Sequence, residues 1–293
     1  MESYTESELT SALAESGIVE GDLVYLSTRL FGLGHMSDCA NRNDFLAKSL
    51  KSIRAVIGAR GTIVAPSFTQ QVGDFAMDYV HETTPCRTGL FSEYIRSQET
   101  SVRSVHPVFS VVANGPLAND ICHEVSPVAF GADSAFDRIV QFGGKATCVG
   151  FQRQTGHIVS LMHHVETVFA VPYYYTKLVA ADVYMSGQKM TQDYFINVKY
   201  LEFDVRFDFL HYISALEKSD LLGHASLGGG DVYTCGGREQ FDLGVRLLKH
   251  DVYAFLAEPP KFVQGRVPCD GTPKNKADFD EVKNWIGHDL SLR

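Results

Sequence analysis

The chain has 293 residues, of which 45% are hydrophobic and 21% charged, and its formal net charge is −9. This length and apolar content suit one large domain or two small ones with a sizeable core, and exclude a disordered chain. The acidic balance argues against a general nucleic-acid binder, and no apolar run reaches the ~20 residues that span a bilayer. The N-terminus lacks a signal-peptide pattern, and the six cysteines are scattered without C-x-x-C, so we expect a cytoplasmic protein.

Helix and strand patterns alternate in the first half of the chain. Apolar residues at helical spacing predict helices, and short apolar runs bounded by turn residues predict strands. In chain order we expect a helix over 5–15, a strand over 22–27, a helix from a cap at Asn43 to Ile57, a strand over 62–65, a helix over 89–97, a strand near 109–113, a helix near 135–142 and a strand over 145–150. This alternation predicts an α/β protein with helices on both faces of the sheet.

The second half has a different pattern. Two strands, 177–185 and 189–195, are predicted to form a hairpin through the turn Ser186-Gly187, so the sheet should be mixed. Gly228-Gly229-Gly230 predicts a flexible loop, and a helix over 239–248 follows. After Pro259-Pro260 the chain is polar until a last short helix over 277–286. We expect a single domain over 1–258 and a C-terminal extension over 259–293 that packs on it.

The segment Met162-His163-His164-Val165-Glu166 contains an H-x-x-E step inside an apolar run. On a helix, residues three apart share a face, with Cβ atoms roughly 5–6 Å apart. A carboxylate there can orient an imidazole and raise its basicity, as a general base requires. The spacing favours His163 over His164 as the partner of Glu166. An isolated H-x-x-E is more often a polar helix face, so other segments must support this interpretation.

Four other segments bear on function. The strand over 22–27 leads into a hydroxyl-rich turn at 27–30, whose backbone N–H groups can hold a ligand. Pro66 ends the next strand and presents Thr69 at the sheet edge. Arg103, in Arg103-Ser104-Val105-His106-Pro107, offers a fork that matches phosphate. The last segment, 135–150, indicates a scaffold of helix, turn and strand. Each signal is weak alone, because such strand ends are common.

Taken together and in order, these segments resemble the aminoglycoside 3-N-acetyltransferase (antibiotic N-acetyltransferase) family. The resemblance includes Gly89-Leu90-Phe91-Ser92-Glu93 and, more weakly, Gly223-His224-Ala225, and runs to about residue 257. It implies a three-layer α/β/α sandwich with a mixed β-sheet. It also implies acetyl-CoA as acyl donor and transfer to an amine of an aminoglycoside or related amino sugar, the chemistry of antibiotic resistance.

The resemblance also implies site residues. Coenzyme A would be held by Ser27, Thr28, Arg29, Leu30, Arg103, Ser104, His106, Phe109 and Ser110. Catalysis would be carried by His163 and Glu166, and the acceptor would be bound by Thr69, Asp74, Glu93 and Glu166. The chain departs from the family at Ser27-Thr28-Arg29, where members commonly have His-Ser-Ser.

Several alternatives remain open at this point. The acceptor could be a nucleotide-linked amino sugar of surface polysaccharide or secondary metabolism. Such an acceptor would require basic residues near the pocket, for which Lys177 and Arg153 are candidates. A metal-dependent hydrolase could use His157, His163, His164 and Glu166, although the spacing differs from H-E-x-x-H. A non-catalytic sugar- or nucleotide-binding module is the third. We predict no metal, no nucleic-acid or membrane partner, a small-molecule amine acceptor and a possible homodimer.

Overall fold

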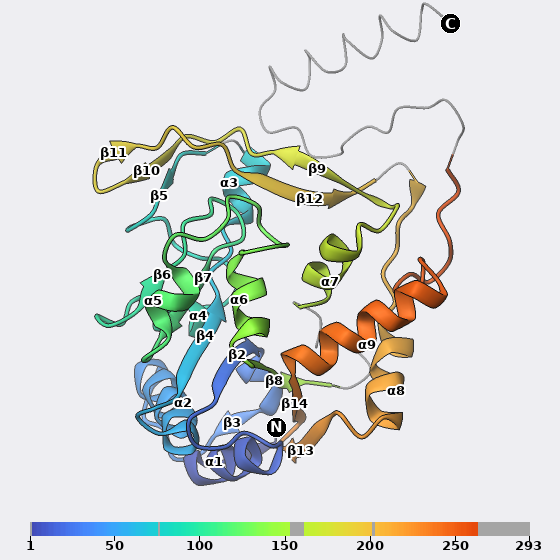
Figure 1. Ribbon diagram of the computed structural model, residues 1–293. Coiled ribbons are helices and arrows are strands. Elements are labelled where there is room, and N and C mark those ends of the chain that lie inside the picture. The colour runs from blue at the N-terminus through green and yellow to red at the C-terminus, as the bar shows by residue number, and fades with distance from the viewer. Residues whose placement is uncertain (1, 76, 153–160, 201–202, 263–293) are drawn as a thin grey trace, which may run out of the picture.

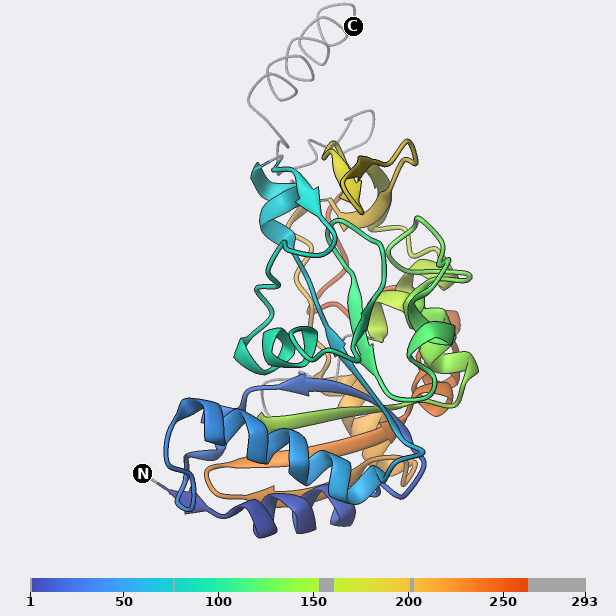
Figure 2. The same ribbon diagram turned by 90° about the vertical axis from the view of Figure 1, so that its left-hand side faces the viewer.

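A computed structural model describes residues 2–75, 77–152, 161–200 and 203–262. Its centre is a seven-stranded mixed sheet in the order β13-β14-β8-β2-β4-β7-β6. Helices α1, α2 and α4 pack on one face, while α5, α6, α7 and α9 pack on the other (Figures 1 and 2). The three-layer α/β/α fold with a mixed sheet is therefore confirmed.

The elements are short and closely spaced. The helices are α1 (Glu6–Glu15), η1 (a 3₁₀ turn, Leu30–Leu33), α2 (Arg42–Ile57), α3 (Gln70–Phe75), α4 (Leu90–Arg96), α5 (Ala118–Cys122), α6 (Ala135–Gln141), α7 (Met162–Phe169), α8 (Leu210–Lys218) and α9 (Gly237–His250). The strands are β1 (Ser3–Tyr4), β2 (Leu23–Thr28), β3 (His35–Met36), β4 (Thr62–Pro66), β5 (Tyr79–Val80), β6 (Val102–Arg103), β7 (Val111–Asn114), β8 (Lys145–Phe151), β9 (Tyr174–Leu178), β10 (Val183–Met185), β11 (Gln188–Lys189), β12 (Phe195–Lys199), β13 (Gly223–Leu227) and β14 (Gly230–Gly236).

The sheet has a parallel centre and antiparallel margins. Strand β2 pairs in parallel with β4 on one side and with β8 on the other, whereas β7 and β14 run antiparallel to their neighbours. The chain passes from β2 to β4 through α2 on one face and reaches β8 through α6 on the other. The carboxyl ends of β2 and β8 therefore flank a topological switch point, where open α/β sheets place their ligands.

Local capping explains where the first helices begin. Thr5 caps α1 in a capping box with Glu8, with hydrogen bonds in both directions. The cap of α2 is Asn41, whose Oδ1 accepts from the N–H groups of Asn43 and Asp44 at 2.9 and 3.1 Å. The predicted cap at Asn43 is therefore wrong by two residues, because Asn43 is itself a capped position.

The turn predicted at Ser186-Gly187 exists, but the two predicted strands, 177–185 and 189–195, are wrong in extent: each is divided in two, and none of the parts joins the central sheet. Ser186 and Gly187 both have positive φ (51° and 74°) and join β10 to β11, as the turn chemistry predicts. The longer strands β9 and β12 pair separately as a ribbon, and the exposed polar residues of β11 suit a surface position. The antiparallel pairing of the central sheet comes instead from β6–β7, β7–β4 and β13–β14–β8.

The glycine triplet at 228–230 is a tight turn rather than the flexible loop expected from sequence. It joins β13 to β14, two strands that the sequence patterns did not predict. Gly228 has a φ of 54°, and a Cβ there would overlap the carbonyl oxygen of Leu33 in η1. Glycine is needed because the turn touches the backbone of η1.

Other expectations concern the ends and surface of the molecule. Phe262, the last described residue, packs against Phe203 and Tyr200 with ring centroids 5.1 and 6.2 Å apart. The final helix expected over 277–286 lies outside the described residues, so the domain division stays a prediction. The five cysteines in the described part are free thiols. No helix among those residues is long and apolar enough to cross a membrane.

Candidate active site

Helix α7 brings the H-x-x-E pair together. Its apolar face, with Met162 and Val165, packs on α9, where Gly244 lets the two helices approach closely. On the same helix His163 Nδ1 lies 2.9 Å from Glu166 Oε2. The imidazole is 35% exposed, whereas the carboxylate is completely buried. The imidazole ring of His163 can therefore be reached from solvent, whereas the Glu166 carboxylate that holds it is contacted by protein groups alone.

Two tyrosines complete the environment of Glu166. Ala170 ends α7 in the left-handed conformation (φ 60°) and turns the chain back toward the helix. Tyr173 then donates to Glu166 Oε1, and Tyr174 at the start of β9 donates to Oε2, both at 2.7 Å. Burial raises the pKa of both hydroxyls above the ordinary tyrosine value, so they remain protonated donors.

The His163 ring lies among aromatic side chains. Ring centroids of Phe130 and Phe207 are 5.8 and 5.5 Å away, and α7 lies between the β9–β12 ribbon and the central sheet (Figure 1). Among the described residues, His163 Nε2 has no hydrogen-bond partner, whereas Nδ1 is held by Glu166 and Tyr174. This arrangement leaves Nε2 available to take a proton from a bound molecule.

His164 has a different role. It is buried on the far side of α7, where its Nδ1 accepts from the Gly131 N–H at 3.2 Å and its Nε2 lies 3.5 Å from Asp137 Oδ1. Burial lowers the pKa of its imidazole to about 4. His164 is thus a neutral core residue, and Glu166 pairs with His163 alone. His157 lies outside the described residues.

Arg103 is occupied by the protein itself. Its guanidinium donates to the Ser110 hydroxyl at 3.1 Å and to backbone carbonyls of Ser67 and Thr84 at 3.0 and 2.7 Å. It also lies over the ring of Tyr79. Through these hydrogen bonds Arg103 connects β6 to the loop that follows β4. Its contact with the phosphates of the cofactor stays a prediction.

The neighbouring predicted residues are also internal. The Nδ1 atom of buried His106 accepts from the N–H of Phe109 at 2.9 Å, and burial lowers the pKa of this histidine to about 4. Ser104 Oγ accepts from the Val111 N–H at 2.9 Å. Thr69 Oγ1 donates to the Pro107 carbonyl at 2.7 Å. This set supports the loop before β7, where Phe109 retains partial exposure.

The turn after β2 lies at the switch point. Arg29 N donates to the Val149 carbonyl of β8 at 2.8 Å and its side chain is exposed, whereas Leu30 is buried. Ser27 and Thr28, the last residues of β2, are half-buried. Gly150 has a φ of 80°, and a Cβ there would overlap the Arg29 carbonyl oxygen. Backbone groups of this turn and the exposed guanidinium of Arg29 therefore lie at the edge of the sheet where a ligand is expected.

Of the predicted acceptor residues, Glu93 is engaged elsewhere. It forms an ion pair with Arg96 at 2.6 Å and accepts from the Cys86 N–H, and Arg96 and Cys86 lower the pKa of its carboxyl despite partial burial. Asp74 belongs to α3. Sequence reasoning missed Phe130, Phe207 and the role of Tyr173 and Tyr174. Of these, only the run Tyr173-Tyr174-Tyr175 is visible in the sequence, where tyrosines before a strand indicate packing more often than stacking on a sugar ring.

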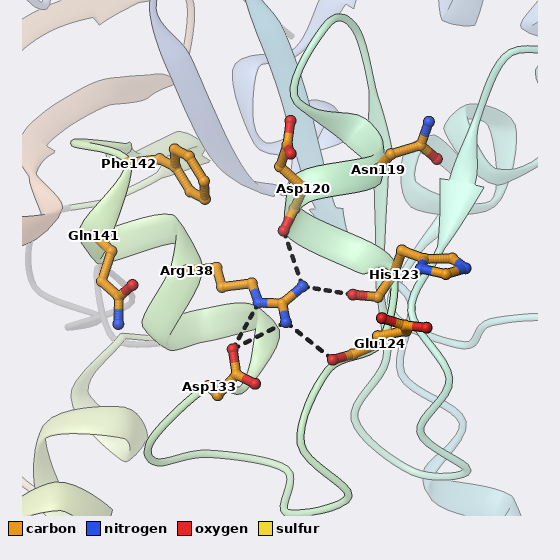
Figure 3. Close-up of a pocket in the computed structure, with 8 residues that line it drawn as sticks. All are labelled: Asn119, Asp120, His123, Glu124, Asp133, Arg138, Gln141 and Phe142. Atoms are coloured by element: carbon orange, nitrogen blue, oxygen red, sulfur yellow. Dashed lines mark hydrogen bonds and ion pairs between the residues drawn. The ribbon is translucent and has the colours of Figure 1, made fainter.

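A surface cavity of about 830 Å³ lies beside α5 and α6 (Figure 3). It shares no lining residue with the His163 network. Arg138 at its centre donates to Asp133 Oδ1 at 2.9 Å and to the carbonyls of Asp120, His123 and Glu124.

No group of three His, Cys, Asp or Glu residues within the described ranges could hold a metal ion. The hydrolase alternative therefore has no support from these residues.

The chain is thus a three-layer α/β/α protein with a His–Glu pair on α7. The family model for aminoglycoside 3-N-acetyltransferase matches residues 7–249, and the chain belongs to that family. Aminoglycoside N(3)-acetyltransferase III of Salmonella is 27% identical over 188 residues, 58% of this chain, and the match spans only 62% of that relative's length. Among solved structures, aminoglycoside acetyltransferase AAC(3)-Xa superposes with a TM-score of 0.71 at 19% identity, over 85% of this chain and 94% of that one. AAC-IIIb, solved as a binary complex with CoASH, gives 0.70 at 18% identity, over 88% and 100%.

Proposed function

We propose that the chain is an acetyl-CoA-dependent N-acetyltransferase that acetylates an amino group of an aminoglycoside or related amino sugar. The observation that carries the proposal is the His163–Glu166 pair at 2.9 Å, with Nε2 directed away from it. Membership of the family supports it, as does the likeness to a structure that holds CoASH. Other family-like structures hold sisomicin and a gentamicin, which are aminoglycosides.

The chemistry follows from the state of the amine. A protonated amine has no lone pair, so one proton must leave to solvent before attack. When the neutral nitrogen bonds to the thioester carbonyl carbon, His163 Nε2 accepts the second proton. Glu166 steadies the resulting imidazolium, as a carboxylate does in triad enzymes. The carbon–sulfur bond then breaks, and the imidazolium returns its proton to the departing thiolate, giving the amide and free coenzyme A.

Direct transfer needs no covalent enzyme intermediate. Burial raises the pKa of Cys122, Cys148 and Cys235 to about 12, so these thiols are protonated and poor nucleophiles. We place the coenzyme at the turn of Ser27–Leu30, because it lies at the carboxyl ends of β2 and β8. The exposed Arg29 would supply a cation for its phosphates, and backbone N–H groups of this turn are the candidate donors to the oxyanion.

The test is release of free thiol from acetyl-CoA in the presence of a panel of aminoglycosides and amino sugars. His163→Ala should lower kcat at least about 100-fold and leave the KM for acetyl-CoA nearly unchanged, since general-base catalysis contributes roughly 10²–10⁴. His211→Ala, which removes an exposed imidazole from α8, is the matched control. Unaltered turnover in His163→Ala would refute the assignment of the base.

One observation favours a second acceptor class, a nucleotide-linked amino sugar. Lys199 Nζ lies 5.2 Å from the ring centroid of Phe207, whose other neighbours include the His163 ring. Lys199 Nζ also donates to the Val205 carbonyl at 2.7 Å, so this cation is held next to a ring that the base contacts too. A cation in this position would repel a polycationic aminoglycoside and attract a diphosphate-linked sugar. The panel should therefore include such sugars, and Lys199→Gln should raise their KM several-fold if they are the substrates.

A further inference from the structure

Three atoms around the base form a closed triangle. His163 Nδ1 lies 2.9 Å from Glu166 Oε2 and 3.0 Å from the Tyr174 hydroxyl oxygen, and that hydroxyl lies 2.7 Å from Oε2. Only two protons, one on the tyrosine oxygen and one on Nδ1, can serve these three edges. The shortest edge takes the tyrosine proton, so the Nδ1 proton is shared between Oε2 and the tyrosine oxygen.

The other carboxylate oxygen is held by Tyr173. This side chain is completely buried, and its hydroxyl donates to Oε1 at 2.7 Å. Each oxygen of Glu166 thus receives a tyrosine O–H, so both oxygens act as acceptors. A carboxylate that only accepts requires its imidazole neighbour to donate, which places the histidine proton on Nδ1.

We propose that Tyr173 and Tyr174 are positioning residues that hold His163 in the Nδ1–H tautomer, so that Nε2 carries the lone pair that receives the substrate's proton. The inference rests on the proposed function of His163 as the base. Without the two hydroxyls the buried carboxylate loses two of its three hydrogen-bond donors, and a buried charge that has lost its donors is costly. A protonated Glu166 would donate to Nδ1 and move the histidine proton to Nε2, which would block the base.

The test combines kinetics with a direct observation of the tautomer. Tyr173→Phe, Tyr174→Phe and the double variant are compared with Tyr212→Phe. Tyr212 is a buried tyrosine of the same apolar cluster, and it donates to the Gln240 carbonyl. Long-range ¹H–¹⁵N correlation spectra of ¹⁵N-histidine-labelled protein report which ring nitrogen is protonated, and loss of the signal in His163→Asn assigns it.

We expect the double variant to shift His163 toward the Nε2–H form. Its kcat should fall at least about tenfold, within the roughly 10⁴-fold that a wrong tautomer costs in a triad enzyme, with the KM for acetyl-CoA unchanged. Tyr212→Phe should keep both the tautomer and kcat. A double variant that retains the Nδ1–H tautomer overturns the proposal whatever its rate.

The tautomer is measured on free protein, so it separates this proposal from the proposed function. If wild-type protein releases no thiol with any amine, the function fails, yet the spectra still decide whether the tyrosines set the tautomer. Thermal melting of each variant guards against misfolding. If the double variant does not fold, Tyr174→Phe alone decides, because it removes a hydroxyl that contacts both His163 and Glu166.

Discussion

At the scale of single residues, the same side-chain type can serve a ligand or the fold, and its hydrogen bonds decide which. Arg103 has the fork that matches a phosphate, but its donors are directed at Ser110 and at carbonyls of the loops after β4 and β5. Arg29 has the same chemistry, is exposed, and lies at the switch point. Burial, which the sequence does not show directly, distinguishes the two arginines.

Arg103→Met should therefore affect stability more than cofactor binding. It removes the donor to the partly buried carbonyls of His81 and Thr84 and one of the two donors to the Ser67 carbonyl, which keeps the Ser110 hydroxyl. The free energy of unfolding should therefore fall by about 2–4 kcal/mol. Urea denaturation measures this fall, and calorimetric titration with coenzyme A should give an unchanged Kd. Arg246→Met, at an exposed position on α9, is the control. A large loss of coenzyme affinity without loss of stability would return Arg103 to the phosphate site.

The site shows how far sequence reasoning reaches at this scale. The spacing of His163 and Glu166 was sufficient to predict that they meet, because helical geometry alone determines which residues share a face. The contact of Glu166 with Tyr173 and Tyr174 depends on the left-handed turn at Ala170, a conformation that few non-glycine residues adopt. The neighbours Phe130 and Phe207 are distant in the chain, so only tertiary packing brings them to His163.

At the scale of elements, the turn after β2 depends on close contact between backbones. Gly150 in β8 faces the Arg29 carbonyl, and Gly230 in β14 packs against Gly150. A side chain at position 150 would push the 3₁₀ turn η1 away from the sheet. Because η1 begins at the end of the turn of Ser27–Leu30, our proposed coenzyme site, the position of that site should be sensitive to a single methyl group.

Gly150→Ala tests this dependence, with Gly143→Ala as a matched control. Both glycines have positive φ (80° and 70°), but a Cβ at Gly143 would meet nothing within 4 Å. Gly143→Ala should cost only the left-handed backbone penalty of about 1–2 kcal/mol. Gly150→Ala should cost more in urea denaturation and also weaken coenzyme A binding measured by calorimetry. Equal effects of the two variants on stability and affinity would contradict the predicted role of the contact.

The predicted elements differ in accuracy for physical reasons. Helices such as 5–15 and 135–142 were predicted to within one residue at each end, because capping residues and apolar spacing are local signals. Strands β13 and β14 were not predicted, since the glycine triplet between them suggested flexibility, and the same glycines are required by contact with η1. Helix α8 was also absent from the prediction; it packs against α9, a contact that local patterns do not specify.

At the scale of the whole molecule, two buried histidines link stability to pH. His106 and His164 come from different parts of the fold, and burial lowers the pKa of each to about 4. His164 has one facing charge, Asp137, which acts in the opposite direction but does not offset burial. Burial also lowers the pKa of His81, beside the cation of Arg103. All three are therefore neutral in the folded protein at pH 7.

The sign of the effect follows from proton binding. In the unfolded chain these histidines titrate near 6.5, so between about pH 6.5 and about 4 the unfolded state binds protons that the folded state does not. Stability is fully present above about pH 6.5 and falls as the pH is lowered, by on the order of 3 kcal/mol for each of His106 and His164 at about pH 4. Between about pH 6.5 and about 5 the histidines should dominate, because carboxylates titrate lower.

His164→Gln should remove the contribution of His164 to the fall in the free energy of unfolding at low pH. A glutamine oxygen can accept from the Gly131 N–H, yet it has no proton to bind, so the fall in the free energy of unfolding from pH 7 to pH 5 should shrink by about a third to a half. Urea denaturation at several pH values measures it. His123→Gln, which removes an exposed histidine, should leave the fall unchanged. If both variants lose stability with pH as steeply as the wild type, the acid sensitivity does not come from His164. The buried His164 imidazole would then carry a proton in the folded protein and form an ion pair with Asp137.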